Sequence, residues 1–213
     1  MVVLFHIIQV VILLAAIACL INKNSYEKRV IFLFFPFLIF TFLVQYGGYY
    51  YSVLLKKPNN WIFNLFGIIE YLFFFFFFYN VYKAIAVKKI YPVLIIAFFL
   101  WSIINLFFVQ GFFVLNTYTD SAACLVTLLS CGIYFRELLI DKNYVNVWRS
   151  NVFWITIALF IYYIGQFVLI FIFPILFKKN PSQSIKFYWS LMIPLNLIEY
   201  SLFTIGFYAA RKR

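Results

Sequence analysis

Seven long, mostly apolar stretches follow one another along the chain, with short polar segments between them. A helix needs about 20 such residues to cross the hydrocarbon core of a bilayer. The chain is 67% hydrophobic and 11% charged, whereas soluble domains average about 45–50% apolar and about 25% charged residues. We therefore predict an all-α polytopic membrane protein, in which residues 1–213 form a single seven-helix transmembrane domain. The predicted spans are Val2–Ile21, Val30–Leu54, Trp61–Tyr82, Ile90–Phe113, Thr119–Ile140, Val152–Phe177 and Ile185–Tyr208.

The segments between these stretches are too short to hold a catalytic domain, so any function must reside inside the bundle or on its rims. The sequence contains no nucleophile motif, phosphate-binding loop or haem motif. It has one His and three Cys, which form no recognisable metal-binding pattern. We expect no enzyme, no catalytic residue, no cofactor and no metal site. The predicted loops are Asn22–Arg29, Lys56–Asn60, Lys83–Lys89, Asn116–Asp120, Asp141–Asn151 and Lys178–Ser184.

Lys and Arg are unevenly divided between the two sides of the predicted bundle. Cytoplasmic loops carry an excess of these residues, so the richer side is predicted to be cytoplasmic, with the N-terminus outside and the C-terminus inside. The net charge of +11 then reflects membrane topology, and we expect no nucleic-acid partner. The richer side carries Lys23, Lys28, Arg29, Lys83, Lys88, Lys89, Arg136, Lys142, Arg149, Arg211, Lys212 and Arg213; the other carries Lys56, Lys57, Lys178, Lys179 and Lys186.

Prolines should shape several spans. Pro36, Pro174 and Pro194 are predicted to lie well inside spans, where each removes a backbone hydrogen bond and tends to kink the helix. Pro92 is predicted to lie in a first turn, where proline is harmless. The first span lacks the basic residues that begin a signal peptide, so we expect it to stay as a helix.

Two carboxyl groups, those of Glu70 and Glu199, fall in the middle of predicted spans. Ionisable residues are costly in a bilayer, usually face the bundle interior, and often mark functional sites. Asn196 is three residues before Glu199 and shares its helix face. Asp120 is predicted to lie near the outer rim, and the inner half of the third span is the uninterrupted aromatic run Phe73–Phe78.

Counting inward from the predicted outer ends, the strongly polar residues gather in the outer half of the bundle. This distribution indicates a pocket that opens to the outside. The alternative is that the Gln and Asn side chains only hold helices together by hydrogen bonds, as polar groups often do in membranes. The candidate ligand-binding residues are Glu70, Glu199, Gln45, Gln166, Asn196, Asn64 and Asn105.

A possible duplication relates the two ends of the chain. The third span contains Ile69-Glu70-Tyr71 and the seventh contains Ile198-Glu199-Tyr200, and one span earlier in each case lies a glutamine, Gln45 or Gln166. These short sequence matches are consistent with a 3+1+3 parallel repeat, in which two three-helix units are joined by the fourth span. Some transporters use parallel repeats to form a substrate site. Short matches also arise by chance in so biased a composition.

Three segments carry a resemblance to a group of known proteins. They are Phe153 to Phe167, Asn64 to Tyr71, and Leu115 to Thr119. Together they resemble uncharacterised bacterial seven-transmembrane-helix proteins that are often encoded near sensor histidine kinases. The resemblance implies a sensory or accessory role beside such a kinase, and it identifies no ligand.

The leading hypothesis is a receptor-like or accessory sensor module of the cytoplasmic (inner) membrane, with an outward-facing polar pocket and a separate signalling partner. The basic inner rim would meet anionic lipid or that partner. The first alternative is a small proton-coupled secondary transporter that uses the same residues. The second is a structural subunit of a membrane complex. The sequence leaves the ligand and the oligomeric state open.

Overall fold

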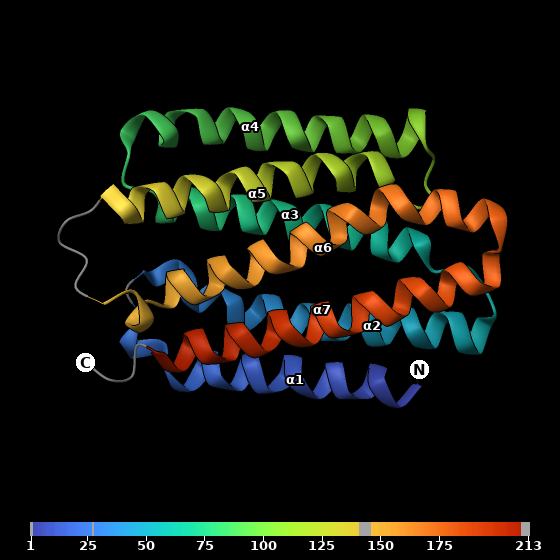
Figure 1. Cartoon of the computed structure of the whole chain (residues 1–213), viewed down its shortest axis with the longest axis horizontal. Helices are drawn as coiled ribbons and strands as arrows, with labels where there is room; N and C mark the ends of the chain where they lie inside the picture. Colours follow the sequence, from blue (N-terminus) through green and yellow to red (C-terminus); the bar gives the residue numbers. More distant parts are fainter. Residues whose placement is uncertain (1, 27, 141–145, 210–213) are drawn as a thin grey trace.

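The chain folds into a bundle of long helices (Figure 1). The computed structural model describes residues 2–26, 28–140 and 146–209, so Lys142, Arg211, Lys212 and Arg213 lie outside the described residues. Seven helices are long and apolar enough to cross a membrane, which confirms the predicted all-α membrane architecture. They are α1 Val2–Ile21, α2 Phe34–Leu55, α3 Asn60–Val81, α4 Ile85–Ile104, α5 Thr117–Ile140, α6 Asn151–Lys179 and α7 Pro181–Ala209.

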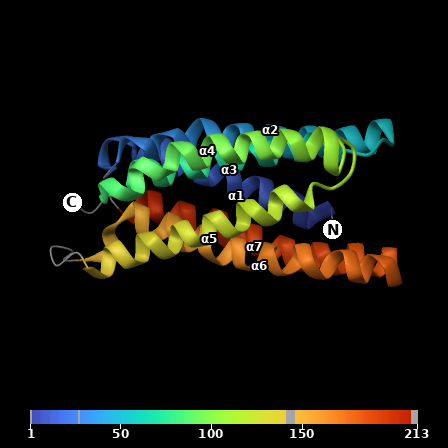
Figure 2. The same ribbon diagram turned by 90° about the horizontal axis from the view of Figure 1, so that it is seen from above.

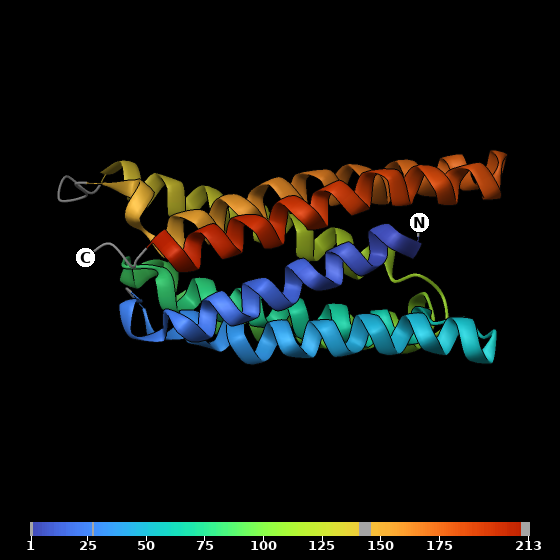
Figure 3. The ribbon, with the colours of Figure 1, turned by 90° about the horizontal axis from the view of Figure 1, so that it is seen from below.

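The helices form two layers. Figures 2 and 3 show α2, α3 and α4 in one layer and α5, α6 and α7 in the other, with α1 along one edge between them. Each helix contacts the next along the chain, and α1 also contacts α7, which closes a ring in chain order. Contacts between α3 and α5 join the layers inside this ring. The two layers diverge toward the end of the bundle where the N-terminus lies (Figure 3).

Several helix ends are held by identifiable polar contacts. The Ser150 hydroxyl accepts a hydrogen bond from the Phe153 N–H and caps α6. The Glu137 carboxylate of α5 accepts from the backbone N–H groups of Lys83 and Ala84 at the start of α4, both at 3.1 Å. A negative group at this position satisfies free donors and complements the helix dipole. It thereby fixes α4 against α5 at the end of the bundle where α4 begins and α5 finishes.

The starts of α4 and α2 correct two predictions about prolines. Because α4 begins at Ile85, Pro92 lies inside the helix and not in its first turn. By contrast, α2 begins only at Phe34, after a 3₁₀ turn over Arg29–Leu33. Pro36 is therefore in the first turn of α2, where a missing N–H breaks no helical bond. The other two interior prolines, Pro174 and Pro194, lie inside α6 and α7 as predicted.

The loop predicted at Lys178–Ser184 is wrong. Only Asn180 separates α6 from α7, with an extended backbone (φ −153°, ψ 94°). Its side chain accepts a hydrogen bond from the Gln183 N–H, so the residue that breaks one helix also caps the next. The result is a hairpin of two 29-residue helices, each about 43 Å long at 1.5 Å per residue.

Two glycines let this hairpin pack closely. A Cβ atom on Gly165 of α6 would lie 2.5 Å from a Leu195 methyl carbon of α7. A Cβ atom on Gly206 of α7 would lie 2.9 Å from the Cβ of Trp154. Near the second contact the Asn151 amide donates to the Gly206 carbonyl at 2.7 Å. Small residues at such crossings are typical of helix pairs in membranes.

Aromatic rings fill the bundle near the end where α2 begins and α7 finishes. The Phe34 ring lies at its centre, with ring-centroid distances of 5.3 Å to Phe77 and 5.4 Å to Phe203. Edge-to-face pairs of this kind contribute about 0.5–1.5 kcal/mol each beyond area burial. All members are fully buried, so the space between them excludes water. This aromatic core consists of Phe34, Phe74, Phe77, Phe203 and Phe207.

Candidate functional site

Three carboxyl groups from three helices approach one another inside the bundle. Glu70 lies on α3, Asp120 on α5 and Glu199 on α7. Glu70 interacts electrostatically with both Asp120 and Glu199. The Glu199 residue is only 2% exposed, and Glu70 and Asp120 are half-buried. We call these three residues the carboxyl cluster; it includes both glutamates that the sequence singled out.

The carboxyl cluster has no positive partner in the part of the chain that the structure describes. Among the described residues, the only charged side chains that interact with its members are other members. Buried carboxylates are normally paired with a cation or neutralised, because an unpaired charge in a low-dielectric interior is very costly. The cluster therefore requires a proton or another cation to balance its charge.

Asp120 reaches the cluster because α5 begins below the rim of the bundle. The preceding loop, Gln110–Asn116, is held against α3 by hydrogen bonds from the Asn64 amide to its carbonyls, and α5 starts at Thr117, short of the point where α6 ends (Figure 1). The Asp120 Oδ1 atom consequently lies beside Gly67 of α3, 3.8 Å from where a Cβ on that glycine would be. Asp120 is also in the first turn of α5, where the helix dipole favours a negative side chain. The sequence analysis predicted Asp120 near the rim and did not include it among the candidate ligand-binding residues.

Tyr71 of α3 links the carboxyl cluster to α6. Its hydroxyl donates a hydrogen bond to Asp120 Oδ1 at 3.3 Å and accepts one from Gln166 Nε2 at 3.2 Å. Tyr71 is 2% exposed, so both bonds are shielded from bulk water. The chain Gln166–Tyr71–Asp120 thus joins α6, α3 and α5 directly beside the carboxyl cluster.

Two buried polar atoms beside the cluster have no hydrogen-bond partner among the described residues. One is the hydroxyl of Tyr163, a fully buried residue that interacts electrostatically with Glu70 and Glu199. The other is Gln166 Oε1, on the same amide that donates to Tyr71. Buried polar groups are rarely left unpaired. The Tyr163 hydroxyl lacks a hydrogen-bond acceptor, and Gln166 Oε1 lacks a donor. The site can therefore form one further hydrogen bond of each kind with a bound group.

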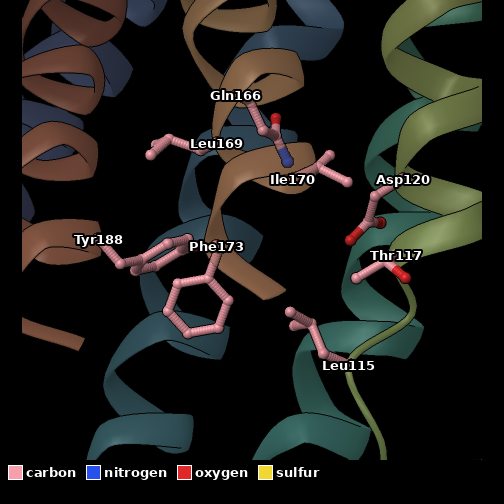
Figure 4. A pocket seen from close by; sticks show the side chains of 8 residues that line it. All are labelled: Leu115, Thr117, Asp120, Gln166, Leu169, Ile170, Phe173 and Tyr188. Carbon is pink, nitrogen blue, oxygen red and sulfur yellow. The ribbon is translucent and has the colours of Figure 1, made fainter. Parts of the chain in front are cut away.

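A small cavity adjoins Asp120 and Gln166, whose side chains face it from α5 and α6 (Figure 4). Its volume is about 30 Å³, and one water needs roughly 10–15 Å³ of such space. The cavity can therefore hold one or two waters but no organic ligand. It lies where α5 begins and α6 ends, toward the end of the bundle that carries the N-terminus. The lining residues are Leu115, Thr117, Asp120, Gln166, Leu169, Ile170, Phe173 and Tyr188.

Other predicted site residues lie at the edge of this group. Gln45 of α2 lies beside the Tyr200 hydroxyl and accepts a 2.6 Å hydrogen bond from Gln9 of α1. Asn196 donates to the Met192 carbonyl of its own helix at 2.7 Å, one turn from Glu199. Both residues are half-buried. Of the seven predicted residues, Gln166 alone lines the described cavity.

Asn64 and Asn105 use their side chains elsewhere. The Asn64 amide donates to the carbonyls of Phe112 and Val114 in the α4–α5 loop, at 3.0 and 2.7 Å. The Asn105 amide donates to Gln110 and Thr119 and makes a further bond to Asn116. Asn105 also starts a short π-helical turn, Asn105–Val109, at the end of α4. Both asparagines hold the loop that positions Asp120.

The sequence reasoning missed Asp120, Tyr71 and Tyr163 as parts of the site. One signal was present: Asp120 is the only acidic residue on the predicted outer side besides the two mid-span glutamates. The positions of the tyrosines were not recognisable among the 17 in the chain.

Comparison of the chain with protein-family models, curated proteins and solved structures gives no match. Function must therefore be argued from the geometry of the site.

Proposed function

We propose that this protein is a receptor-like or accessory sensor module of a bacterial cytoplasmic (inner) membrane, acting through a separate signalling partner such as a histidine kinase. The ligand is a small cation, with the proton as the smallest case, and it enters the outer half of the bundle. The observation that carries this proposal is the carboxyl cluster, in which three acidic side chains interact without a positive partner among the described residues.

The position of the cluster supports a role in signalling. Glu70 belongs to the layer of α2, α3 and α4, whereas Asp120 and Glu199 belong to the other layer. Mutual repulsion pushes the layers apart, and a bound positive charge would draw them together. A ligand shifts a conformational equilibrium only through such a difference in affinity between two states.

The distribution of basic residues supports the orientation. Lys23, Arg29, Lys88 and Arg149 lie near the end of the bundle where α1 ends and α6 begins. Short cytoplasmic loops carry such an excess, so the N-terminus is outside and the cavity opens outward. The C-terminus is then cytoplasmic, and the basic end meets anionic lipid or the signalling partner.

The aromatic core supports a receptor over a transporter. Phe34, Phe77 and Phe203 are fully buried between the carboxyl cluster and the basic end. A transporter must open its site to each side of the membrane in turn. To do so, the side chains of the aromatic core would have to separate. One-sided access needs no such opening.

A small proton-coupled secondary transporter is the second candidate, for two reasons. Tyr82 donates to the Ser130 carbonyl at 2.8 Å, and its hydroxyl lies 3.1 Å from that of Tyr91. These buried polar groups lie beyond the aromatic core and could form part of an exit. Glu70 and Glu199 also occupy corresponding places on α3 and α7, as the proposed 3+1+3 parallel repeat requires. The third reading, a structural subunit, predicts no response to any ligand.

The test measures the distance between the layers. Spin labels are placed on Lys57→Cys, in the α2–α3 turn, and Lys179→Cys, at the end of α6, after Cys19, Cys124 and Cys131 are replaced by Ala. The labelled protein in liposomes is exposed to acid, Na⁺, K⁺, Mg²⁺ and tetramethylammonium.

A receptor shortens the distance between the two labels with at least one probe and moves no ion across the bilayer. Glu70→Gln and Glu199→Gln abolish the response, and Glu137→Gln, a carboxyl outside the cluster, preserves it. Dye-detected flux would favour the transporter, and a constant distance with every probe would overturn the proposal.

A further inference from the structure

The small cavity beside Asp120 and Gln166 limits which cation the carboxyl cluster can bind. We infer that the ligand is the proton, and that it is taken up through the small cavity by Asp120, with Gln166 as the group that receives its hydrogen bond. This inference rests on the proposed function, because it names the ligand of the same site. It assigns the first step to Asp120 and not to either mid-span glutamate.

Size excludes the larger candidates. The cavity of about 30 Å³ accommodates one or two waters and cannot admit an organic ammonium ion without rearrangement. Separation argues against a chelated metal ion. Among the described residues, no three His, Cys, Asp or Glu side chains are close enough together to hold a metal. The three carboxyl groups are thus near enough to interact electrostatically but do not converge as three ligands on one metal ion. A proton needs only one oxygen.

Access selects Asp120 among the three carboxyl groups. It is the only member of the cluster that lines the cavity, and Figure 4 shows its carboxyl group directed into the space between α5 and α6. Glu199 is 2% exposed and lies deeper in the bundle. A proton that arrives with cavity water therefore meets Asp120 first.

The unpaired atoms beside the cluster fit a protonation step. A proton that a cavity water relays from the outer solution forms an O–H bond on Asp120. The carboxylate becomes a neutral acid, and the water that passed the proton on is left neutral. The new O–H group, directly or through a cavity water, supplies the donor that Gln166 Oε1 lacks. Tyr71 keeps its present bond to Oδ1. The unpaired Tyr163 hydroxyl supplies a donor for whichever neighbouring glutamate remains charged.

Removal of one negative charge lowers the repulsion across the two layers. The described groups that interact with Asp120 carry no positive charge, so its protonation breaks no existing ion pair. These groups are Glu70 and Tyr71 on α3, Cys124 on α5 and Tyr188 on α7. The groups that face Glu70 in addition are Tyr162 and Tyr163 on α6 and Tyr200 on α7.

Infrared difference spectroscopy of the lipid-embedded protein tests the inference. Acidification should produce the carbonyl band of a protonated carboxylic acid, accompanied by the shortening of the distance between labels. Asp120→Asn should remove this band. Gln166→Leu should keep the band but shift its frequency, because the acid loses its hydrogen-bond acceptor. Glu137→Gln should change neither. Tyr71→Phe, which retains the ring, provides a second variant if Asp120→Asn fails to fold: it should shift the same band.

Contrary outcomes separate the inference from the function on which it rests. A band that persists in Asp120→Asn but disappears in Glu70→Gln or Glu199→Gln overturns the assignment to Asp120. If no band depends on pH but Na⁺ or tetramethylammonium shortens the distance, the proton is not the ligand, although the cation receptor stands. If neither pH nor any cation changes the protein, both proposals fail.

Discussion

Asn64 illustrates how a polar residue in a membrane helix can be essential to a site without touching a ligand. Its amide binds two carbonyl groups of the α4–α5 loop, those of Phe112 and Val114. That loop determines how deep α5 begins and hence where Asp120 lies. Asn64 was predicted as a ligand contact, and in the structure its amide supports the loop that positions Asp120.

Asn64→Ala should lower the free energy of unfolding by about 1–3 kcal/mol, because two carbonyl groups lose their donor in a partly buried place. Thermal unfolding in detergent measures the change. Asn60→Ala is the matched control, since Asn60 makes one bond to the same loop, to the Phe113 carbonyl, at the surface; it should cost less. Unchanged stability in Asn64→Ala, together with loss of the response to cations, would identify Asn64 as a ligand contact after all.

For single residues, the sequence indicates which side chains are energetically costly to bury in a membrane. It does not indicate which other side chains they contact. Glu70 and Glu199 could be found because a carboxyl group in an apolar stretch is expensive anywhere on the helix. Asp120 could not, because its depth depends on the path of a loop outside its own helix. The unpaired Tyr163 hydroxyl is a property of the packing of three helices, and no pattern along the chain indicates it.

At the scale of elements, the existence of the helices was easier to predict than their ends. Every apolar stretch became a helix, since lipid leaves a spanning backbone few alternatives. The ends depended on single contacts. The carboxylate of Glu137 supports an earlier start of α4 than hydropathy indicates, and Asn180 replaces a predicted loop of several residues. Both shifts changed the role of a proline or a loop without altering the number of spans.

The close packing of α6 on α7 gives a prediction at this scale. Gly206→Ala should destabilise the hairpin by about 1–3 kcal/mol, because the added methyl group would meet the Cβ of Trp154 at 2.9 Å and cannot be accommodated by a side-chain rotation. Denaturation of the bilayer- or micelle-bound protein measures this cost. Gly132→Ala, in α5, places its methyl group in open space and should be neutral or stabilising by up to about 1 kcal/mol through helix propensity. Equal effects of the two variants would refute this account.

At the scale of the whole molecule, the bundle consists of two three-helix layers with α1 at their edge. This grouping was not predicted, because hydropathy identifies spans but not their neighbours. It matters for function because the carboxyl cluster crosses the boundary between the layers. The predicted 3+1+3 repeat groups the helices differently and stays a prediction.

The proposed orientation can be tested on intact cells. With Cys19, Cys124 and Cys131 replaced by Ala, a membrane-impermeant maleimide should label Lys57→Cys without lysis, because the proposed orientation places the α2–α3 turn outside. Lys23→Cys, in the segment after α1, should be labelled only once the membrane is opened. Both native lysines are exposed, so accessibility to the reagent is otherwise matched. The reverse pattern would place the carboxyl cluster on the cytoplasmic side.

The length of the α6–α7 hairpin also affects the surrounding lipid. These helices are about 43 Å long, whereas the 20 residues of α1 span about 30 Å, the thickness of an ordinary hydrocarbon core. The perimeter of the protein is therefore uneven. Acyl chains beside the hairpin must stretch, or the hairpin must tilt, while those beside α1 are matched. A thinner bilayer would increase the tilt of the α6–α7 hairpin relative to the layer of α2, α3 and α4. Membrane thickness would therefore change the packing at the boundary where Glu70, Asp120 and Glu199 meet.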